Sequence, residues 1–172
     1  MAIAAALALF AQVGVIAVLV SLLVGPLGDA GAAAAVSLTT SCAIGGRLLA
    51  GLLPARVDWR LIAAANFVMQ ACGVGLLLGT DTAAPLLTGC ALFGLGLGNS
   101  VSLSPLIAQA EFERIDVGRV VALVTAFNQA LFSFAPVVFG LLHDLAGGWQ
   151  APLLGAALLD VTAAAIMVMG RK

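Results

Sequence analysis

The sequence has few charged residues: Asp, Glu, Lys and Arg make up 9% of the 172 residues, whereas ordinary soluble domains carry about 25%. A chain with so little charge cannot cover its surface as a soluble globule does. The seven basic residues are scattered and the net charge is -1, so the clustered positive footprint that nucleic-acid binding requires is missing. We therefore exclude a soluble globular protein and a nucleic-acid partner.

Histidine and cysteine are also scarce. His143 is the only histidine, which excludes a metal centre built from several histidines. Cys42, Cys72 and Cys90 each lie in an apolar run without C-x-x-C spacing, and they are interpreted as small packing residues. No metal and no cofactor are expected. The chain begins without a basic segment, and its first apolar run extends to Val24, too long for a signal peptide; this run predicts an uncleaved first helix.

Hydrophobic residues make up 63% of the sequence. A hydrocarbon core about 30 Å thick is crossed by about 20 apolar helical residues, and the sequence supplies that length repeatedly. The spans are continuously apolar, without the alternation of a membrane barrel. We predict an all-α, polytopic membrane protein that forms a single six-helix transmembrane domain over residues 1–172 and contacts the lipid bilayer. The predicted spans are 3–24, 31–53, 61–79, 84–107, 117–142 and 149–169.

The links between these spans alternate in charge. The first, third and fifth links contain no Lys or Arg, whereas the second carries Arg56 and Arg60, the fourth carries Arg114 and Arg119, and the tail is basic. Basic loops stay in the cytoplasm, so the pattern predicts cytoplasmic termini in the cell's inner (plasma) membrane.

Arg47 precedes the second link and lies within the predicted span 31–53. A charged side chain inside a membrane span is costly and must reach the interface, a partner or water. Two interpretations stay open: Arg47 extends to the cytoplasmic interface or pairs structurally, or it binds an anionic group.

Other polar residues also interrupt the apolar spans. They usually make hydrogen bonds between helices, and some could line a substrate cavity; the amides are Asn66, Gln70, Asn99, Asn128 and Gln129. Asp160 lies near the middle of the last span, either as a packed neutral acid or as a proton-coupling group.

Glycine and proline mark two further features of the spans. Gly94 to Gly98 has the pattern G-L-G-L-G without the spacing of a dinucleotide loop, and predicts a surface for helix packing. Pro136 predicts a kink in the fifth span.

Two segments resemble the major facilitator superfamily of transporters. The stretch from Phe134 to Trp149, with its P-x-x-x-G-x-x-x-D spacing and glycine turn, is similar to the penultimate helix and last external loop of that family. Gly51, Arg56 and Arg60 match part of its cytoplasmic G-x-x-x-D-R-x-G-R-R loop motif. Three motif positions differ, because Ala55, Asp58 and Trp59 replace Asp, Gly and a basic residue, and the missing Asp puts the family's conformational latch in doubt.

The resemblance implies the C-terminal six-helix half of such a transporter, in which a small molecule crosses by alternating access between two halves. This chain would then need a separate N-terminal six-helix half or a second copy as its partner. Arg47 stands four residues before Gly51, where carriers similar to the monocarboxylate transporters hold a substrate carboxylate. An organic anion is therefore the expected substrate.

Two alternatives belong to other classes. A rhomboid-like intramembrane protease also has six helices, and Gly98-Asn99-Ser100 begins its G-x-S-G motif, but Val101 replaces the last glycine and His143 is expected in an external loop. No enzymatic activity is expected. The chain could also be a non-transporting membrane module or an inactive transporter remnant.

Overall fold

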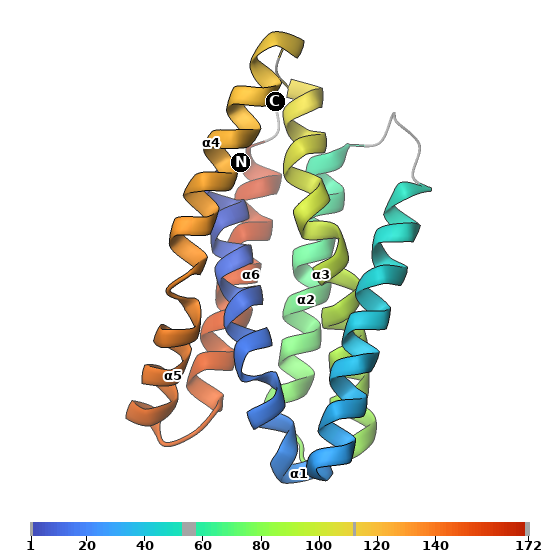
Figure 1. The fold of residues 1–172 in the computed structure, drawn as a ribbon, viewed down its shortest axis with the longest axis vertical. Coiled ribbons are helices and arrows are strands. Elements are labelled where there is room, and N and C mark those ends of the chain that lie inside the picture. The colour runs from blue at the N-terminus through green and yellow to red at the C-terminus, as the bar shows by residue number, and fades with distance from the viewer. Residues whose placement is uncertain (1, 53–57, 112, 171–172) are drawn as a thin grey trace.

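The computed structural model describes residues 2–52, 58–111 and 113–170, and in these residues the chain is all-α (Figure 1). The helices are α1 (Ala2–Gly51), α2 (Trp59–Leu78), α3 (Ala83–Glu111), α4 (Arg114–Phe132), α5 (Ala135–Ala146) and α6 (Gln150–Met169). Five segments are long and apolar enough to cross a membrane, α4 and α5 together forming one of them. The chain thus has the character of a multi-pass membrane protein.

Helix α1 contains both of the first two predicted spans. It runs toward one end of the bundle and then returns beside α3 (Figure 1), and the backbone leaves helical geometry inside it at Gly28, where φ is 69° and ψ is 174°. We call residues 2–27 the first arm and 29–51 the second arm. The break falls inside the predicted link 25–29, but it is shorter than predicted, because helical geometry continues through Pro26 and is left only at Gly28.

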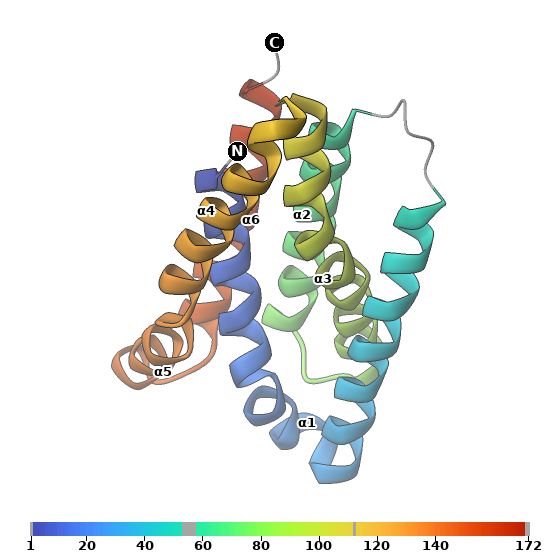
Figure 2. The same ribbon diagram turned by 45° about the horizontal axis from the view of Figure 1, so that its top comes forward.

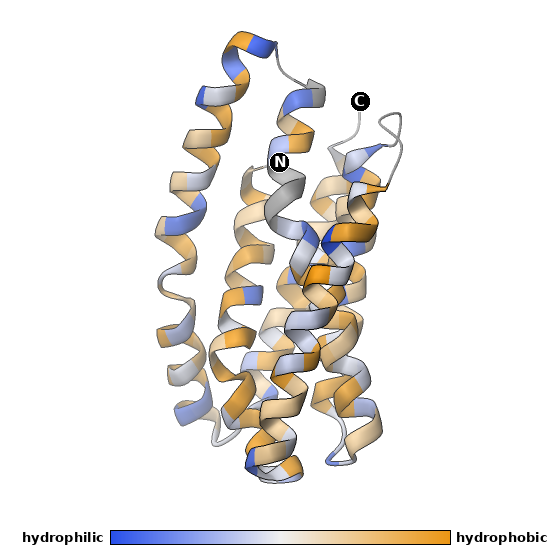
Figure 3. Cartoon of the chain, turned by 45° about the vertical axis from the view of Figure 1, so that its right-hand side comes forward, coloured by the Kyte–Doolittle hydropathy of each residue, from blue (hydrophilic) through white to orange (hydrophobic). Residues whose placement is uncertain are grey.

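The lengths of α2 and α6 match a bilayer. Each has 20 residues, or about 30 Å at 1.5 Å per residue, the thickness of a hydrocarbon core. Trp59 begins α2 and Trp149 immediately precedes α6, so the two tryptophans mark opposite ends of the bundle, as in the aromatic belts of membrane proteins. Hydrophilic residues gather mainly near the helix ends and at a few interior positions (Figure 3).

Both described ends of the chain lie toward the Trp59 end of the bundle (Figures 1 and 2). The basic residues of the described chain share this end, because Arg47 is in the last turns of α1, Arg60 is in the first turn of α2, and Arg114 and Arg119 are in the first turns of α4. Which side of a membrane this end faces stays a prediction.

Glycines allow α3 to approach its neighbours closely. A Cβ atom at Gly94 or Gly98 would overlap the backbone carbonyl oxygens of Thr39 or Ala43 on the second arm, and one at Gly96 would overlap Gln70 of α2. The predicted packing surface at Gly94 to Gly98 is thus confirmed. In lipid, such close backbone contact contributes van der Waals attraction that the hydrophobic effect does not supply between helices.

The fifth predicted span is interrupted near Pro136. Helix α4 ends at Phe132 and α5 begins at Ala135, with Pro136 in the first turn of α5, where its missing N–H leaves no helical acceptor unpaired. The predicted kink is therefore a break just before the proline. Beyond it, Gly147 ends α5 in the left-handed conformation, with φ of 70°.

Candidate functional site

A cluster of polar side chains lies inside the bundle around Ser100 of α3. Its members come from three helices and are almost fully buried: Gln12, Asn66, Gln70 and Ser100 are between 0 and 6% exposed. Gln12 Nε2 donates to Gln70 Oε1 at 2.6 Å and also to Ser100 Oγ. Gln70 Nε2 and Asn66 Nδ2 donate to the same hydroxyl, each at 3.2 Å. The cluster therefore ties α1, α2 and α3 together within an apolar surrounding.

More side-chain N–H groups lie within hydrogen-bond distance of Ser100 Oγ than this oxygen has lone pairs to accept them. A hydroxyl has one proton and two acceptor lone pairs, and its own proton goes to the Gly96 carbonyl at 3.3 Å. Three amides from Gln12, Asn66 and Gln70 thus compete for two lone pairs. One of the three amide N–H groups therefore lacks a lone pair of its own on Ser100 Oγ.

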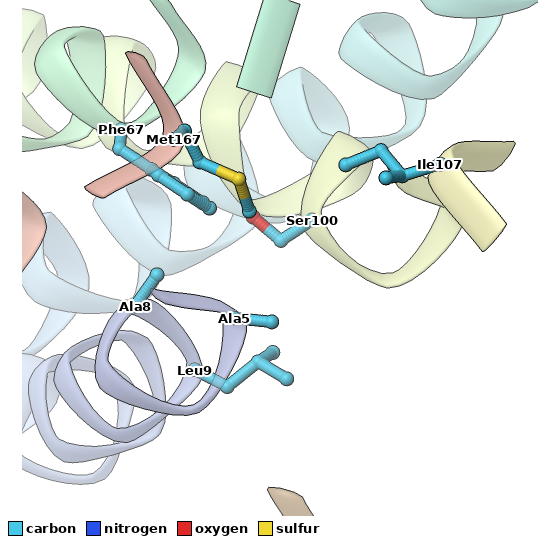
Figure 4. A pocket seen from close by; sticks show the side chains of 7 residues that line it. All are labelled: Ala5, Ala8, Leu9, Phe67, Ser100, Ile107 and Met167. Carbon is cyan, nitrogen blue, oxygen red and sulfur yellow. The ribbon is translucent and has the colours of Figure 1, made fainter. Parts of the chain in front are cut away.

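Asn99 extends the cluster toward the outside. It is half-buried, its Nδ2 lies 3.4 Å from Asn66 Oδ1, and its own buried Oδ1 accepts no hydrogen bond from the described residues. A cavity of about 10 Å³ adjoins Ser100 and is otherwise lined by apolar side chains (Figure 4). This is about the smallest volume that holds a water molecule, so the cluster as it stands encloses no room for an organic substrate.

The structure joins three of the predicted amides, Asn66, Gln70 and Asn99, and adds two residues that the sequence reasoning had not assigned to a binding site. Gln12 satisfies the same criterion as the others, an amide in the middle of an apolar span, and could have been found by it. Ser100 enters the sequence analysis only as the serine of a partial protease motif. A serine in a membrane helix can bond the backbone of its own helix, so its residue type does not by itself predict a contact between helices.

Three other candidates lie outside the cluster. Asn128 is buried on α4, where its Oδ1 has no partner in the described part of the chain, and Gln129, one residue further, is exposed. Asp160 is 0% exposed on α6, and neither of its carboxyl oxygens has a partner among the described residues.

Arg47 borders a separate, open groove between the second arm and α3. The groove has a volume of about 320 Å³ and is lined mainly by Thr40, Ala43, Ile44, Leu48, Leu97 and Gly98. Arg47 Nε donates to the Gly98 carbonyl at 3.1 Å, and in the described chain the guanidinium has no acidic partner. The bond orients the side chain while its two terminal nitrogens keep donors for a ligand.

The residues of the loop motif have separate positions. Gly51 ends α1, and no described atom lies within 4 Å of a Cβ placed there; Arg56 lies outside the described residues. Arg60 Nη1 donates to the Gly170 carbonyl at 2.7 Å, and so places a positive charge at the C-terminal end of α6, where the helix dipole favours it. Asp58 caps α2 by accepting from Arg60 N at 3.0 Å.

Ser100 and His143, the pair that a protease would need, have different partners. Ser100 is bonded to the amides inside the bundle. His143 lies near the end of α5, with Nδ1 3.2 Å from Asp144 Oδ1 and its ring 3.9 Å from the Trp149 ring centroid. The described structure does not bring a base to the Ser100 hydroxyl.

Replacing Ser100 by alanine tests the importance of the cluster. Ser100→Ala should lower the free energy of unfolding by about 1–3 kcal/mol, because buried amides lose their acceptor. The matched control is Ser37→Ala, since the exposed Ser37 hydroxyl donates to the Ala33 carbonyl of its own helix, at 2.9 Å, and its loss should change stability by less than about 0.5 kcal/mol. Unfolding by SDS titration measures both, and equal effects would show that the cluster contributes nothing special.

Apolar helices of bilayer length around a buried polar cluster define the class: an all-α, multi-pass membrane protein. Comparison of the sequence with known family models and with curated proteins finds no match.

Proposed function

We propose that this chain is the membrane-embedded half of a secondary transporter for small organic anions, similar to the C-terminal half of a major facilitator superfamily carrier. The arrangement of the helices supports this proposal. The two arms of α1, the helices α2, α3 and α6, and the α4–α5 pair would give six crossings if each spans the bilayer once, and both described ends of the chain lie toward the same end of the bundle. We assign the basic Trp59 end to the cytoplasm, because basic segments remain there.

One observation carries the choice of substrate: the Arg47 guanidinium borders an open groove without an acidic partner in the described chain. Arginine binds carboxylates through paired, charge-assisted hydrogen bonds, and such bonds strengthen where water is sparse. The groove volume of about 320 Å³ falls at the small end of ordinary ligand pockets. A small carboxylate therefore fits the site in charge and in size.

Alternating access requires a second half across the transport path. Large apolar side chains are exposed along α4 and α5, including Leu123, Phe127, Phe134 and Leu141, and such side chains must contact lipid or another transmembrane chain. The partner in this proposal is an N-terminal six-helix half or a second copy of the chain.

Uptake by the reconstituted protein tests the substrate class. Liposomes containing the chain should accumulate at least one of acetate, lactate or benzoate, and Arg47→Ala should reduce this uptake about 10- to 100-fold, the effect of losing a charge-assisted contact. Arg119→Ala is the control, because Arg119 is an exposed cation at the same end of the bundle. It should keep uptake within about twofold, as surface charges contribute little.

Two results would contradict the proposal. One is an absence of anion uptake by the wild-type chain both alone and together with a six-helix partner. The other is equal uptake by wild type and Arg47→Ala, which would leave Arg47 as an interfacial residue only.

A further inference from the structure

Gln129 is exposed in the middle of a membrane crossing. Helices α4 and α5 form one apolar segment, Arg114–Ala146, and Gln129 lies 15 residues after its first residue and 17 before its last. In the most apolar stretch of this segment 17% of the residues are buried, compared with 39–53% in the other spans. The α4–α5 pair runs along one edge of the bundle (Figures 1 and 2), so much of α4 is open to a neighbour from outside the chain.

Two polar side chains on α4 lack a partner within the described chain. Thr125 and Gln129 are four residues apart, so they share one side of the helix, and both are exposed. Neither side chain makes a hydrogen bond to a described residue, whereas the exposed hydroxyls of Ser41 and Thr162 donate to carbonyls of their own helices. An amide without a partner is costly in hydrocarbon, so this side of α4 needs a polar neighbour.

Small residues continue the same side toward the start of α4. Gly118 and Ala122 precede Thr125 and Gln129 at spacings of four, three and four residues, and all four are exposed. We call these four residues the Gln129 face. A Cβ added at Gly118 would meet no described atom within 4 Å, so packing inside the chain does not require the glycine. Small residues around a polar side chain are typical of contacts between membrane helices.

The opposite side of α4 has a different character. Leu123, Phe127 and Leu131 follow one another at spacings of four residues and are 74%, 48% and 40% exposed. These large apolar side chains suit contact with hydrocarbon tails, which require neither close approach nor hydrogen bonds. The two exposed sides of one helix therefore favour two different neighbours, lipid on the Leu123 side and another polypeptide on the Gln129 face.

We propose that the Gln129 face binds the same face of a second copy of this chain, so that two α4 helices pair within the membrane. A side-chain amide carries both donors and an acceptor. Across a two-fold axis, Gln129 of one copy meets Gln129 of the other, and each amide both donates and accepts. Such a contact uses the same surface on both copies and closes as a dimer. Two copies inserted in the same orientation place the paired helices parallel.

The charges at the start of α4 fit a parallel pair. Glu113, Arg114 and Asp116 are exposed and form no ion pair among the described residues. In the dimer these first turns lie at the same end, where Arg114 of each copy is offered the acidic groups of the other. A surface that carries both signs of charge is complementary to itself, and complementary charge selects partners. This favours a second copy as the neighbour.

For transport, the inference rests on the proposed function, because it names a second copy as the other half of the carrier. The pairing of α4 helices itself needs no substrate, and it can be measured without transport.

Cysteines introduced on the two sides of α4 test the contact directly. In liposomes under mild oxidation, Ala122→Cys should give a disulfide-linked dimer above the background of the wild-type chain, which already contains Cys42, Cys72 and Cys90. Leu123→Cys is the matched control, because it introduces the same group one residue further along, on the side assigned to lipid, and should stay at background.

The strength of association tests the role of the amide. Energy transfer between fluorescently labelled chains, followed as the protein-to-lipid ratio falls, gives the dissociation constant in the bilayer. Gln129→Leu should raise this constant about 3- to 30-fold, the range that corresponds to hydrogen bonds between membrane helices, whereas Gln129→Asn keeps an amide and should recover most of the association. Ala122→Phe should abolish energy transfer, and Leu123→Phe should leave it unchanged. All these positions are exposed, so the fold should be retained.

Three results would overturn the inference. The first is a wild-type chain that stays monomeric, as it would if lipid covered the Gln129 face. The second is a dimer that is equally stable in wild type, Gln129→Leu and Ala122→Phe. The third is a chain that is monomeric alone and uses this face only for a separate six-helix polypeptide. Arg47-dependent uptake by a monomeric chain would overturn the pairing and leave the proposed function intact, whereas a dimer through the Gln129 face that moves no anion would refute only the proposed function.

Discussion

Gly98→Ala is expected to destabilise the protein by about 1–3 kcal/mol, the usual cost of overfilling a packed interior. A Cβ at this position would overlap the Ala43 carbonyl group of the second arm, where the obstacle is backbone and cannot rotate away. The same change would displace the Gly98 carbonyl that accepts from Arg47. Thermal unfolding of the purified protein in detergent measures the loss.

The control for this substitution is Gly155→Ala on α6, where no atom of the described residues lies within 4 Å of an added Cβ. Because alanine favours a helix over glycine by about 1 kcal/mol, this variant should be as stable as wild type or more so. If Gly98→Ala unfolded at the same temperature as Gly155→Ala, α1 and α3 would not be in the close contact described.

Gly28→Ala is the second large effect that we expect. The backbone at Gly28, with φ of 69° and ψ of 174°, lies in a region that is essentially restricted to glycine, and a side chain there costs about 1–3 kcal/mol. Gly25→Ala is the matched control, because Gly25 lies three residues away within the helix and an added Cβ there would also meet no described atom within 4 Å. Only Gly28→Ala should lower the unfolding midpoint; a change of similar size in both variants would contradict the reversal at Gly28.

This reversal is required by length. A straight helix of 50 residues would extend about 75 Å at 1.5 Å per residue, more than twice the thickness of a hydrocarbon core of about 30 Å. The two arms on either side of Gly28 each match one crossing. The prediction of two apolar spans separated near residues 25–29 is therefore confirmed, although the break is confined to Gly28.

The positions of the later helices could be predicted closely. The predicted spans 61–79 and 149–169 differ by at most two residues from α2 and α6, because each apolar run is bounded by polar residues, glycine or tryptophan. Which residues face inward could not be predicted, since helices that are apolar on all sides give no preferred face. Gln129 illustrates this: it was grouped with the other amides and is exposed.

The sequence by itself determined that this protein lies in a membrane, because so few charged residues and so many long apolar runs are compatible only with a lipid bilayer. It also predicted the approximate positions of most helices and the end of the bundle at which the described basic residues lie. The tertiary structure decided which polar groups meet. Gln12, Gln70 and Ser100 are far apart in the chain, and only the close packing permitted by the glycines of α3 brings their side chains together. It also left the carboxyl oxygens of Asp160 without a hydrogen-bond partner among the described residues, because such partners depend on how helices dock, and docking is set by shape and small residues rather than by hydrophobic pattern.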